Sequence, residues 1–315
     1  MISSELDAAG VREPSLREAY RQCRDVNARH GKTFFLATRL LAPRQRPAVH
    51  ALYGFARGAD DILDDFDSAR STQERGEQLQ RLSVRLFESL VENRPNHDDP
   101  TLTAVVHTAR EYDIGWDLFD DFLTSMRMDL TITDYADRAA LERYMYGSAE
   151  VIGLQMLPVL GTVVPREEAA PRAAALGKAF QLTNFLRDID EDLTRGRVYL
   201  PADELAVHGV DRELLTWCQA RRRTDDRVRW ALAEQVAICR SVYEQARPGV
   251  NLLAPASRPC VAAALTLYSE ILDSIEAADF EIFGRRATVG KPRRVVVAAK
   301  GIGKAWASRL RYGSV

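Results

Sequence analysis

Four carboxylates stand within six residues, between Asp60 and Asp65, directly after the apolar run 49–56. A helix turns once in about 3.6 residues, so Asp60 and Asp64 would project from one face, and Asp61 and Asp65 would repeat this spacing beside them. Like charges one turn apart repel by roughly a few tenths of a kcal/mol. Such a cluster alone is more often a solvated helix end, but Mg²⁺, which takes carboxylate and phosphate oxygens, would turn the repulsion into a binding site.

A second polar cluster follows more than a hundred residues later. Gln181, Asn184, Asp188 and Asp192 recur at steps of three and four, which places them along one face of a helix. The other faces of this helix are apolar and carry Leu182, Phe185, Leu186 and Ile189. A polar stripe beside apolar residues indicates a lined cavity rather than open solvent.

The two clusters have the same arrangement, because each combines carboxylates one turn apart with an arginine, Arg57 or Arg187. Metal ions held between two such helices would bind a diphosphate, and cationic side chains would take its remaining oxygens. This pattern favours cleavage of an allylic carbon–diphosphate bond, which leaves a carbocation that needs a dry, partly aromatic pocket. The candidates for the pocket wall, each more often plain core, are Phe34, Phe55, Tyr146, Phe180 and Phe185.

The rest of the chain reads almost entirely as helix. Ser15 is the expected N-cap of the first long helix, with Glu18 three residues on, and residues 134–161 read as one long helix with small residues for close packing. The β-branched run Val295-Val296-Val297 is too brief to argue a sheet. Because no repeat and no Gly/Ser/Pro-rich linker divides the chain, we expect one all-α domain over residues 1–315, a helical bundle around a central apolar cavity.

Composition excludes several classes of protein. The net charge of -2 gives no general preference for nucleic acid. The four cysteines are scattered without metal-ligand spacing, as expected of reduced thiols in a cytoplasmic protein. The N-terminus lacks the apolar region of a signal peptide, and no run of 18 apolar residues is present.

The C-terminal tail, about 283–315, contains nine Lys or Arg residues and no Asp or Glu. The simpler interpretation is a solvated basic tail or terminal helix. The sharper one is a patch that favours anionic lipid surfaces, where an oily product would be delivered.

Two long motifs carry a family resemblance. Tyr53-x-Phe55-x-Arg57-x-x-Asp60-Asp61-x-x-Asp64, and Gln181-x-x-Asn184-x-x-Arg187-Asp188-x-x-Glu191-Asp192 with Arg195-Gly196-Arg197-x-Tyr199-x-Pro201, resemble the two signatures of the squalene/phytoene synthase family. His30-Gly31-Lys32-Thr33-Phe34 is similar to the family's HSKSF-type segment, and Tyr146 opens a stretch similar to its small-residue helix. The resemblance covers about 15–290.

The resemblance implies an all-α isoprenoid-synthase domain (class I) that condenses two prenyl diphosphates head to head (1'-1). It assigns a role to each matched position. Mg²⁺, or Mn²⁺ in its place, would be bound by Asp60, Asp64, Asp188 and Asp192, supported by Asp61 and Glu191. Diphosphates would be held by His30, Lys32, Arg57, Asn184, Arg187 and Arg197. The reacting centre would be lined by Tyr53, Tyr146, Gln181 and Tyr199, with Asp129 as a further acid.

Three positions depart from the family pattern. Gly31 stands where a serine is usual, which removes a hydroxyl contact. Glu150 stands where glycine is usual, so that its carboxylate would point either at the cavity or at its rim. Asp190 is an extra acid two residues after Asp188 and should face away from the site.

Within the family, the sequence favours phytoene synthesis from two geranylgeranyl diphosphates through prephytoene diphosphate. The segments Tyr53–Arg57 and Arg197–Pro201 resemble bacterial enzymes of this activity, and no dinucleotide fingerprint points to NADPH. An upstream prenyl diphosphate synthase would supply the substrate, and peripheral membrane contact is an expectation that rests on the tail. The alternatives are a presqualene diphosphate or squalene synthase using farnesyl diphosphate, a prenyltransferase with another acceptor, and a catalytically silent helical scaffold.

Overall fold

The computed structural model of the chain describes residues 2–63, 70–94, 98–284 and 286–312. Within these ranges the secondary structure is helical, and extended pairing is limited to two isolated bridges, Asp134 with Val198 and Thr162 with Leu253. The all-α expectation is therefore confirmed. No helix in these ranges combines the length and apolar character that crossing a bilayer requires.

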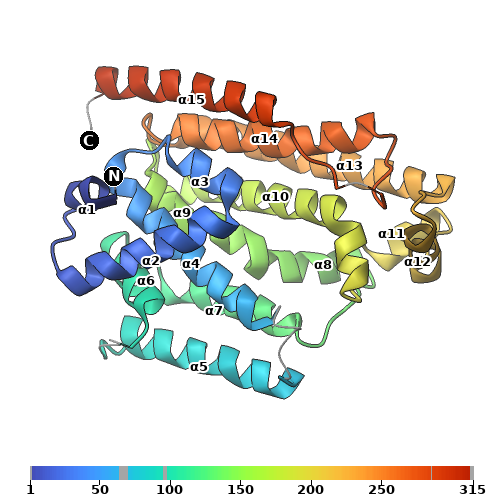
Figure 1. Cartoon of the computed structure of the whole chain (residues 1–315), viewed down its shortest axis with the longest axis horizontal. Coiled ribbons are helices and arrows are strands. Elements are labelled where there is room, and N and C mark those ends of the chain that lie inside the picture. Colours follow the sequence, from blue (N-terminus) through green and yellow to red (C-terminus); the bar gives the residue numbers. More distant parts are fainter. Residues whose placement is uncertain (1, 64–69, 95–97, 285, 313–315) are drawn as a thin grey trace.

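The helices lie side by side in a bundle (Figure 1). Those of the first part of the chain are α1 (Ile2–Ala8), α2 (Pro14–His30), α3 (Lys32–Thr38), α4 (Arg46–Leu63), α5 (Thr72–Leu90), α6 (Pro100–Glu111) and α7 (Trp116–Met128). Those of the second part are α8 (Arg138–Met145), α9 (Val151–Leu160), α10 (Arg166–Thr194), α11 (Ala202–Val207), α12 (Arg212–Arg221), α13 (Asp226–Ala246), α14 (Arg258–Ala277) and α15 (Lys291–Tyr312). Three short segments, η1 (Pro43–Gln45), η2 (Tyr146–Glu150) and η3 (Arg247–Leu252), connect them.

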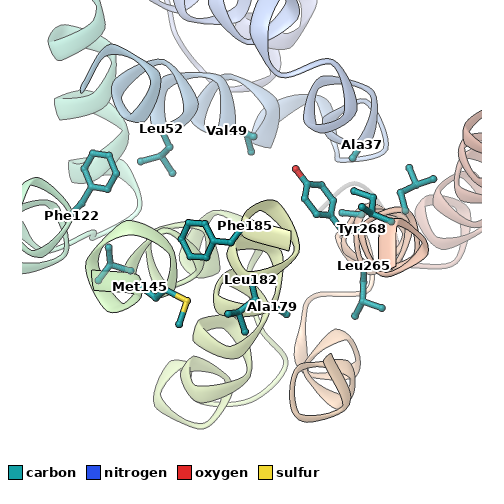
Figure 2. Packing of buried hydrophobic residues seen from close by; sticks show 14 of the residues in the cluster. Ala37, Val49, Leu52, Phe122, Met145, Ala179, Leu182, Phe185, Leu265 and Tyr268 are labelled. Atoms are coloured by element: carbon teal, nitrogen blue, oxygen red, sulfur yellow. The ribbon is translucent and has the colours of Figure 1, made fainter. Parts of the chain in front are cut away.

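Two helices organise the bundle. α4 packs against α2, α6 and α9, and α10 packs against α9, α13 and α14, so the helices that carry the acidic motifs both lie inside it. Figure 2 shows the apolar layer between them, in which Val49 and Leu52 of α4 lie opposite Leu182 and Phe185 of α10. These four side chains are all buried. Their burial fixes the rotation of each helix about its axis, and so the direction of its polar stripe.

Close helix approach depends on two glycines, of which Gly153 belongs to the expected small-residue stretch and Gly177 does not. A Cβ added at Gly153 of α9 would come within 2.3 Å of the Ala173 carbonyl oxygen, and one at Gly177 of α10 within 2.2 Å of the Ala149 carbonyl oxygen. Because backbone atoms cannot yield as a flexible side chain can, larger residues would force α9 and α10 apart.

Two local expectations are wrong. The N-cap of α2 is Glu13, not Ser15, because the Glu13 carboxylate accepts hydrogen bonds from the backbone N–H groups of Ser15 and Leu16. The long helix expected over 134–161 starts only at Arg138, and the π-helical turn η2 interrupts it. A π-turn adds a residue to the helical repeat, so it changes which side chains face the core on either side of it.

Candidate active site

A cavity of about 760 Å³ opens beside the C-terminal halves of α4 and α10, and α3 and α14 contribute to its wall. Its lining brings together most of the site residues predicted from the two motifs and from the segment at His30. These are His30, Lys32, Tyr53, Arg57, Asp60, Gln181, Asn184, Arg187, Asp188, Glu191, Asp192, Arg197 and Tyr199. Residues far apart in the sequence therefore meet at one polar mouth with apolar residues such as Phe34, Leu267 and Ile271 in its wall.

The α10 stripe faces this cavity in the order predicted from its spacing. The Asn184 side-chain amide donates to Oε1 of Gln181 at 3.3 Å. Its own oxygen, Oδ1, is buried and accepts no hydrogen bond from any described residue. Leaving a buried amide oxygen without a hydrogen-bond donor costs free energy. Oδ1 of Asn184 lies one turn before the carboxylate of Asp188 and two turns before that of Asp192. This row of oxygens is the kind of donor set that a hard cation such as Mg²⁺ takes.

Arginines surround Asp188. The Arg187 guanidinium donates to both carboxylate oxygens, at 2.8 and 2.5 Å. Arg286, from the segment before α15, donates a further bond of 2.8 Å and lies 3.7 Å from Glu191. A doubly paired carboxylate facing a cavity places cationic groups where the oxygens of a diphosphate would lie.

Asp192 lies one helical turn after Asp188 and is partly buried. Burial raises the pKa of Asp192 to about 7, and the negative charge of Asp188 one turn away acts in the same direction. Ionising this carboxylate therefore costs free energy unless a positive charge arrives. The acid is suited to receiving a cation.

The α4 side supplies Asp60 and Arg57 to the cavity wall. Arg57 forms an ion pair with Asp61 at i+4, and Asp61 itself is not among the lining residues. Asp64 and Asp65 lie outside the described residues. In the described part of the chain, no three acidic, His or Cys side chains converge on one point. Asp61, Asp188 and Glu191 are instead paired with arginines.

An aromatic wall stands beside the acids. The Tyr199 ring stacks on Phe185 with centroids 4.2 Å apart, and it also stacks on Tyr144 at 5.6 Å. The Tyr144 hydroxyl donates to Oδ2 of Asp129 at 2.7 Å, and the Tyr199 hydroxyl donates to Oδ1 at 3.4 Å. Arg197 donates to the Asp129 carbonyl oxygen at 2.8 Å. This wall would stabilise a carbocation through its rings while its hydroxyls stay fixed.

The structure places Tyr146 outside the cavity, against the sequence-based assignment. Its side chain is 44% exposed and bonds to Asp121 of α7. Tyr144, two residues earlier, lines the cavity and is buried. Two residues correspond to about 200° around a helix, so the two tyrosines point in nearly opposite directions. The apolar spacing of Leu141, Tyr144 and Met145 indicates the core-facing side of this helix, but it does not by itself tell which tyrosine reaches the cavity.

Among the lining residues that the sequence did not single out, two contact the Arg187–Asp188 pair. Tyr268 of α14 bonds to Arg187, and burial raises its pKa to about 12. In the sequence it is one aromatic in an apolar helix, so no local signal distinguishes it. Arg286 belongs to the stretch interpreted as a tail, and only its approach to Asp188 reveals its place.

The structure shows which of the aromatic candidates line the cavity and which pack elsewhere. Phe34 and Phe185 line the cavity, whereas Phe55 packs on Phe119 and Phe122, and Phe180 on Tyr243 and Tyr268.

Two acidic residues of the sequence analysis point away from the cavity. Glu150 lies 3.8 Å from Lys178 and is not a lining residue, so its carboxylate turns away from the cavity. Asp190 also faces away and accepts a 3.0 Å bond from Gln219 of α12.

Comparison with known proteins decides the family. The family profile described as squalene/phytoene synthase matches residues 27–293. This chain belongs to the squalene/phytoene synthase family. A chloroplastic phytoene synthase of Daucus carota is 37% identical over 299 residues, which are 93% of this chain and 72% of that protein. Phytoene synthase 1 of Arabidopsis thaliana is 38% identical over 94% of this chain and 69% of that protein.

Two solved structures share the fold. A dehydrosqualene synthase crystallised with a ligand superimposes with a TM-score of 0.81 at 25% identity, covering 93% of this chain and 98% of that one. The squalene synthase HpnC from Alicyclobacillus acidocaldarius gives a TM-score of 0.75 at 24% identity, covering 87% of this chain and 98% of that one. The isoprenoid-synthase bundle is therefore the fold of this family member.

Proposed function

We propose that this protein is a phytoene synthase, a prenyltransferase that joins two geranylgeranyl diphosphates head to head and releases diphosphate. The observation that carries the proposal is the meeting of the two acidic motifs, a set of basic side chains and an aromatic wall in one cavity. Those basic side chains include His30, Lys32, Arg57, Arg187 and Arg197. Relatives with 37–38% identity over most of the chain support this activity.

We propose Mg²⁺ as the cofactor. The donor chemistry fits, because the lining offers carboxylates and the unbonded amide oxygen of Asn184. Asp60, Asp188, Asn184 and Asp192 would hold the ion, with Asp64 completing the set from outside the described residues and with Asp61 and Glu191 in support. Bound Mg²⁺ would neutralise a departing diphosphate. Mn²⁺ would satisfy the same ligands.

The side chains of the cavity divide the remaining work. Arg57, Arg187 and Arg197, with His30 and Lys32 at the mouth, would bind diphosphate oxygens. The carbon–oxygen bond of one allylic diphosphate breaks with its electron pair on oxygen. The C2–C3 double bond of the second molecule attacks the resulting cation, and loss of a proton closes a cyclopropane ring.

The second half of the reaction starts from this cyclopropylcarbinyl diphosphate. Its carbon–oxygen bond breaks, the ring rearranges, and loss of another proton gives phytoene without a hydride donor. Phe185, Tyr144 and Tyr199 would face the successive cations. Their rings stabilise positive charge, and their close packing excludes water that would otherwise trap it.

We further propose that the whole chain folds as a single domain and takes its substrate from an upstream prenyl diphosphate synthase. A C40 hydrocarbon carries no polar group, so its release calls for an apolar acceptor. We therefore propose that the protein works at a membrane surface.

The test incubates purified protein and Mg²⁺ with the C15 or the C20 diphosphate, with and without NADPH, and identifies the extracted product. Phytoene from the C20 substrate alone is expected. A C30 product from the C15 substrate, as a squalene or dehydrosqualene synthase would make, or a requirement for NADPH, would overturn the proposal. Absence of diphosphate release with either substrate would favour a silent scaffold.

A further inference from the structure

Tyr144 is held at two points by α7. Its hydroxyl donates to Oδ2 of Asp129, the C-cap of α7, at 2.7 Å. Its backbone carbonyl oxygen accepts a second bond, of 2.9 Å, from Oγ of Ser125. Ser125 and Asp129 are four residues apart, which corresponds to about one helical turn. One turn of α7 therefore holds both the backbone and the side-chain end of Tyr144.

Ser125 itself does not reach the cavity. Its side chain is buried, and it is not a lining residue. The hydroxyl therefore contacts no substrate, and any effect that it has on the reaction passes through Tyr144.

The carbonyl that Ser125 binds stands two residues before the π-helical turn η2. The extra residue of such a turn shifts the helical repeat, and π-turns are found mostly where a site requires them. The turn sets the rotation of α8, which carries Tyr144, relative to α9. It leaves Tyr144 in the cavity wall and Tyr146 on the surface.

α7 approaches the π-turn closely at Gly147. A Cβ added there would come within 2.2 Å of Oγ of Ser125 and within 2.2 Å of the carbonyl oxygen of Asp121. Glycine at this position thus leaves room for the Ser125 hydroxyl. The side chain of Asp121 in turn bonds to the hydroxyl of Tyr146. Both ends of the segment from Tyr144 to Tyr146 are therefore tied to α7.

α10 contacts the other side of the π-turn. Lys178 donates to Glu142 of α8 at 2.6 Å and lies 3.8 Å from Glu150, so it bridges the two sides of the turn. Ion pairs that are open to solvent contribute little. A buried carbonyl that loses its donor costs more, so the bond from Ser125 is the contact on which the turn depends most.

We propose that Ser125 is a positioning residue of the reaction, which holds the backbone of Tyr144 and the π-turn that follows it. With its carbonyl fixed by Ser125 and its hydroxyl by Asp129, the Tyr144 ring keeps its place against Phe185 and Tyr199. The wall that faces the carbocation then stays closed to water. The effect on turnover rests on the proposed function, whereas the hold on the turn does not.

Ser125→Ala removes the hydroxyl and keeps the Cβ. With Mg²⁺ and the C20 diphosphate, we expect kcat for diphosphate release to fall by about fivefold while KM stays within about twofold, because the groups that bind diphosphate do not move. A displaced ring also admits water to the cation, so the share of free prenyl alcohol among the products should rise by about threefold or more. An unchanged kcat with an unchanged share of alcohol would overturn the proposal.

Ser257→Ala is the matched control. Ser257 is also a buried serine that donates to a carbonyl oxygen at a helix end, that of Leu160, at 2.6 Å, and it does not line the cavity. Its replacement should lower the melting temperature at least as much as Ser125→Ala does, but kcat should stay within about twofold of wild type. An equal loss of kcat in the two variants would assign the effect to stability and overturn the proposal.

A double-mutant cycle connects Ser125 to Tyr144. In a Tyr144→Phe background the hydroxyl that Asp129 accepts from is already gone, so adding Ser125→Ala should lower kcat by less than about twofold further. Losses that multiply in full would mean that Ser125 acts independently of Tyr144, against the proposal.

Hydrogen exchange over residues 141–150, followed by mass spectrometry, detects the hold on the turn without any catalysis. Ser125→Ala should speed the exchange of these amides by about tenfold or more, and Ser257→Ala should leave it unchanged. Unchanged exchange in Ser125→Ala would refute the hold. If this variant does not fold, Ser125→Cys, whose thiol is a weaker donor, replaces it in every measurement with the same expected directions. A wild-type protein that releases no diphosphate, beside a variant with faster exchange, would refute only the proposed function.

Discussion

The Tyr144 hydroxyl donates a hydrogen bond of 2.7 Å to Oδ2 of Asp129. Burial, followed by the Asp129 charge, holds the pKa of Tyr144 well above its ordinary value, so the phenol stays protonated. The donated bond fixes the orientation of the ring against Tyr199 and Phe185. Asp129 thereby positions two tyrosines, because its other oxygen accepts from Tyr199.

Tyr144→Phe and Tyr146→Phe should differ sharply in turnover. The first removes a buried hydroxyl beside the aromatic wall, and we expect kcat to fall by about tenfold or more. The second removes only a surface contact with Asp121, and kcat should change by less than about twofold. Steady-state release of diphosphate measures both. A larger loss in Tyr146→Phe would return the assignment to the residue that the sequence first suggested.

Asp60→Asn and Asp188→Asn should abolish turnover without unfolding the protein. Each keeps the side-chain shape but removes a charge that a metal ion would need, and we expect a loss of about a hundredfold or more in kcat. Asp190→Asn is the matched control, since Asp190 faces α12 rather than the cavity. Circular dichroism checks the fold, and Mg²⁺ with diphosphate should raise the melting temperature of wild type and control only. Full activity in either active-site variant would disprove the metal-binding proposal.

His50 should make the protein less stable in mild acid. It is buried in α4, and its Nδ1 accepts a 3.0 Å bond from the side-chain amide of Asn27. Burial, with Arg24 and Arg46 adding to it, lowers the pKa of His50 to about 3. Between this value and about 6.5, the unfolded chain binds a proton that the folded one does not. The contribution of His50 to the free energy of unfolding is therefore fully present above about pH 6.5. Each pH unit below that value should lower the free energy of unfolding by up to about 1.4 kcal/mol.

Urea unfolding at several pH values measures this effect. The variant His50→Gln keeps a polar group opposite Asn27, and its free energy of unfolding should depend less on pH than that of wild type. His208→Gln is the control, because His208 is only partly buried, beside Glu234. An equal pH slope in wild type and His50→Gln would contradict the prediction.

Gly31→Ala should disturb the cavity. A Cβ there would come within 2.6 Å of Oδ1 of Asn27 and 2.8 Å of the Tyr53 ring, so Tyr53 must move. We expect a loss of about 1–3 kcal/mol in unfolding free energy and a raised KM, because Tyr53 lines the site. Gly58→Ala is the control, since its Cβ would meet nothing within 4 Å. Alanine there should be neutral or stabilise α4 by up to about 1 kcal/mol.

The glycine at position 31 also shows how context changes the meaning of a departure from the family pattern. From the sequence, it meant a lost hydroxyl. In the structure, the missing Cβ of Gly31 leaves room for the Tyr53 ring and the Asn27 side chain. Glu150 is a second such departure, because its carboxylate lies toward Lys178 and away from the cavity.

Local spacing was enough to predict the helical class, the acid-bearing faces of α4 and α10, and the outward direction of Asp190. These properties follow from the period of the helix, which acts over a few residues. The same local information could not choose between Tyr144 and Tyr146, because a π-turn begins between them and its formation depends on packing against α7 and α10.

What the sequence alone determined is the chemistry, namely two rows of acids with their arginines and the residue types that suit diphosphate. Only the tertiary structure decided which side chains share the cavity with them. Arg286 reaches Asp188 across 98 positions of the chain, and Tyr268 reaches Arg187 from α14. Such contacts depend on how whole helices pack and rotate against one another, and the burial of many distant apolar side chains sets that arrangement.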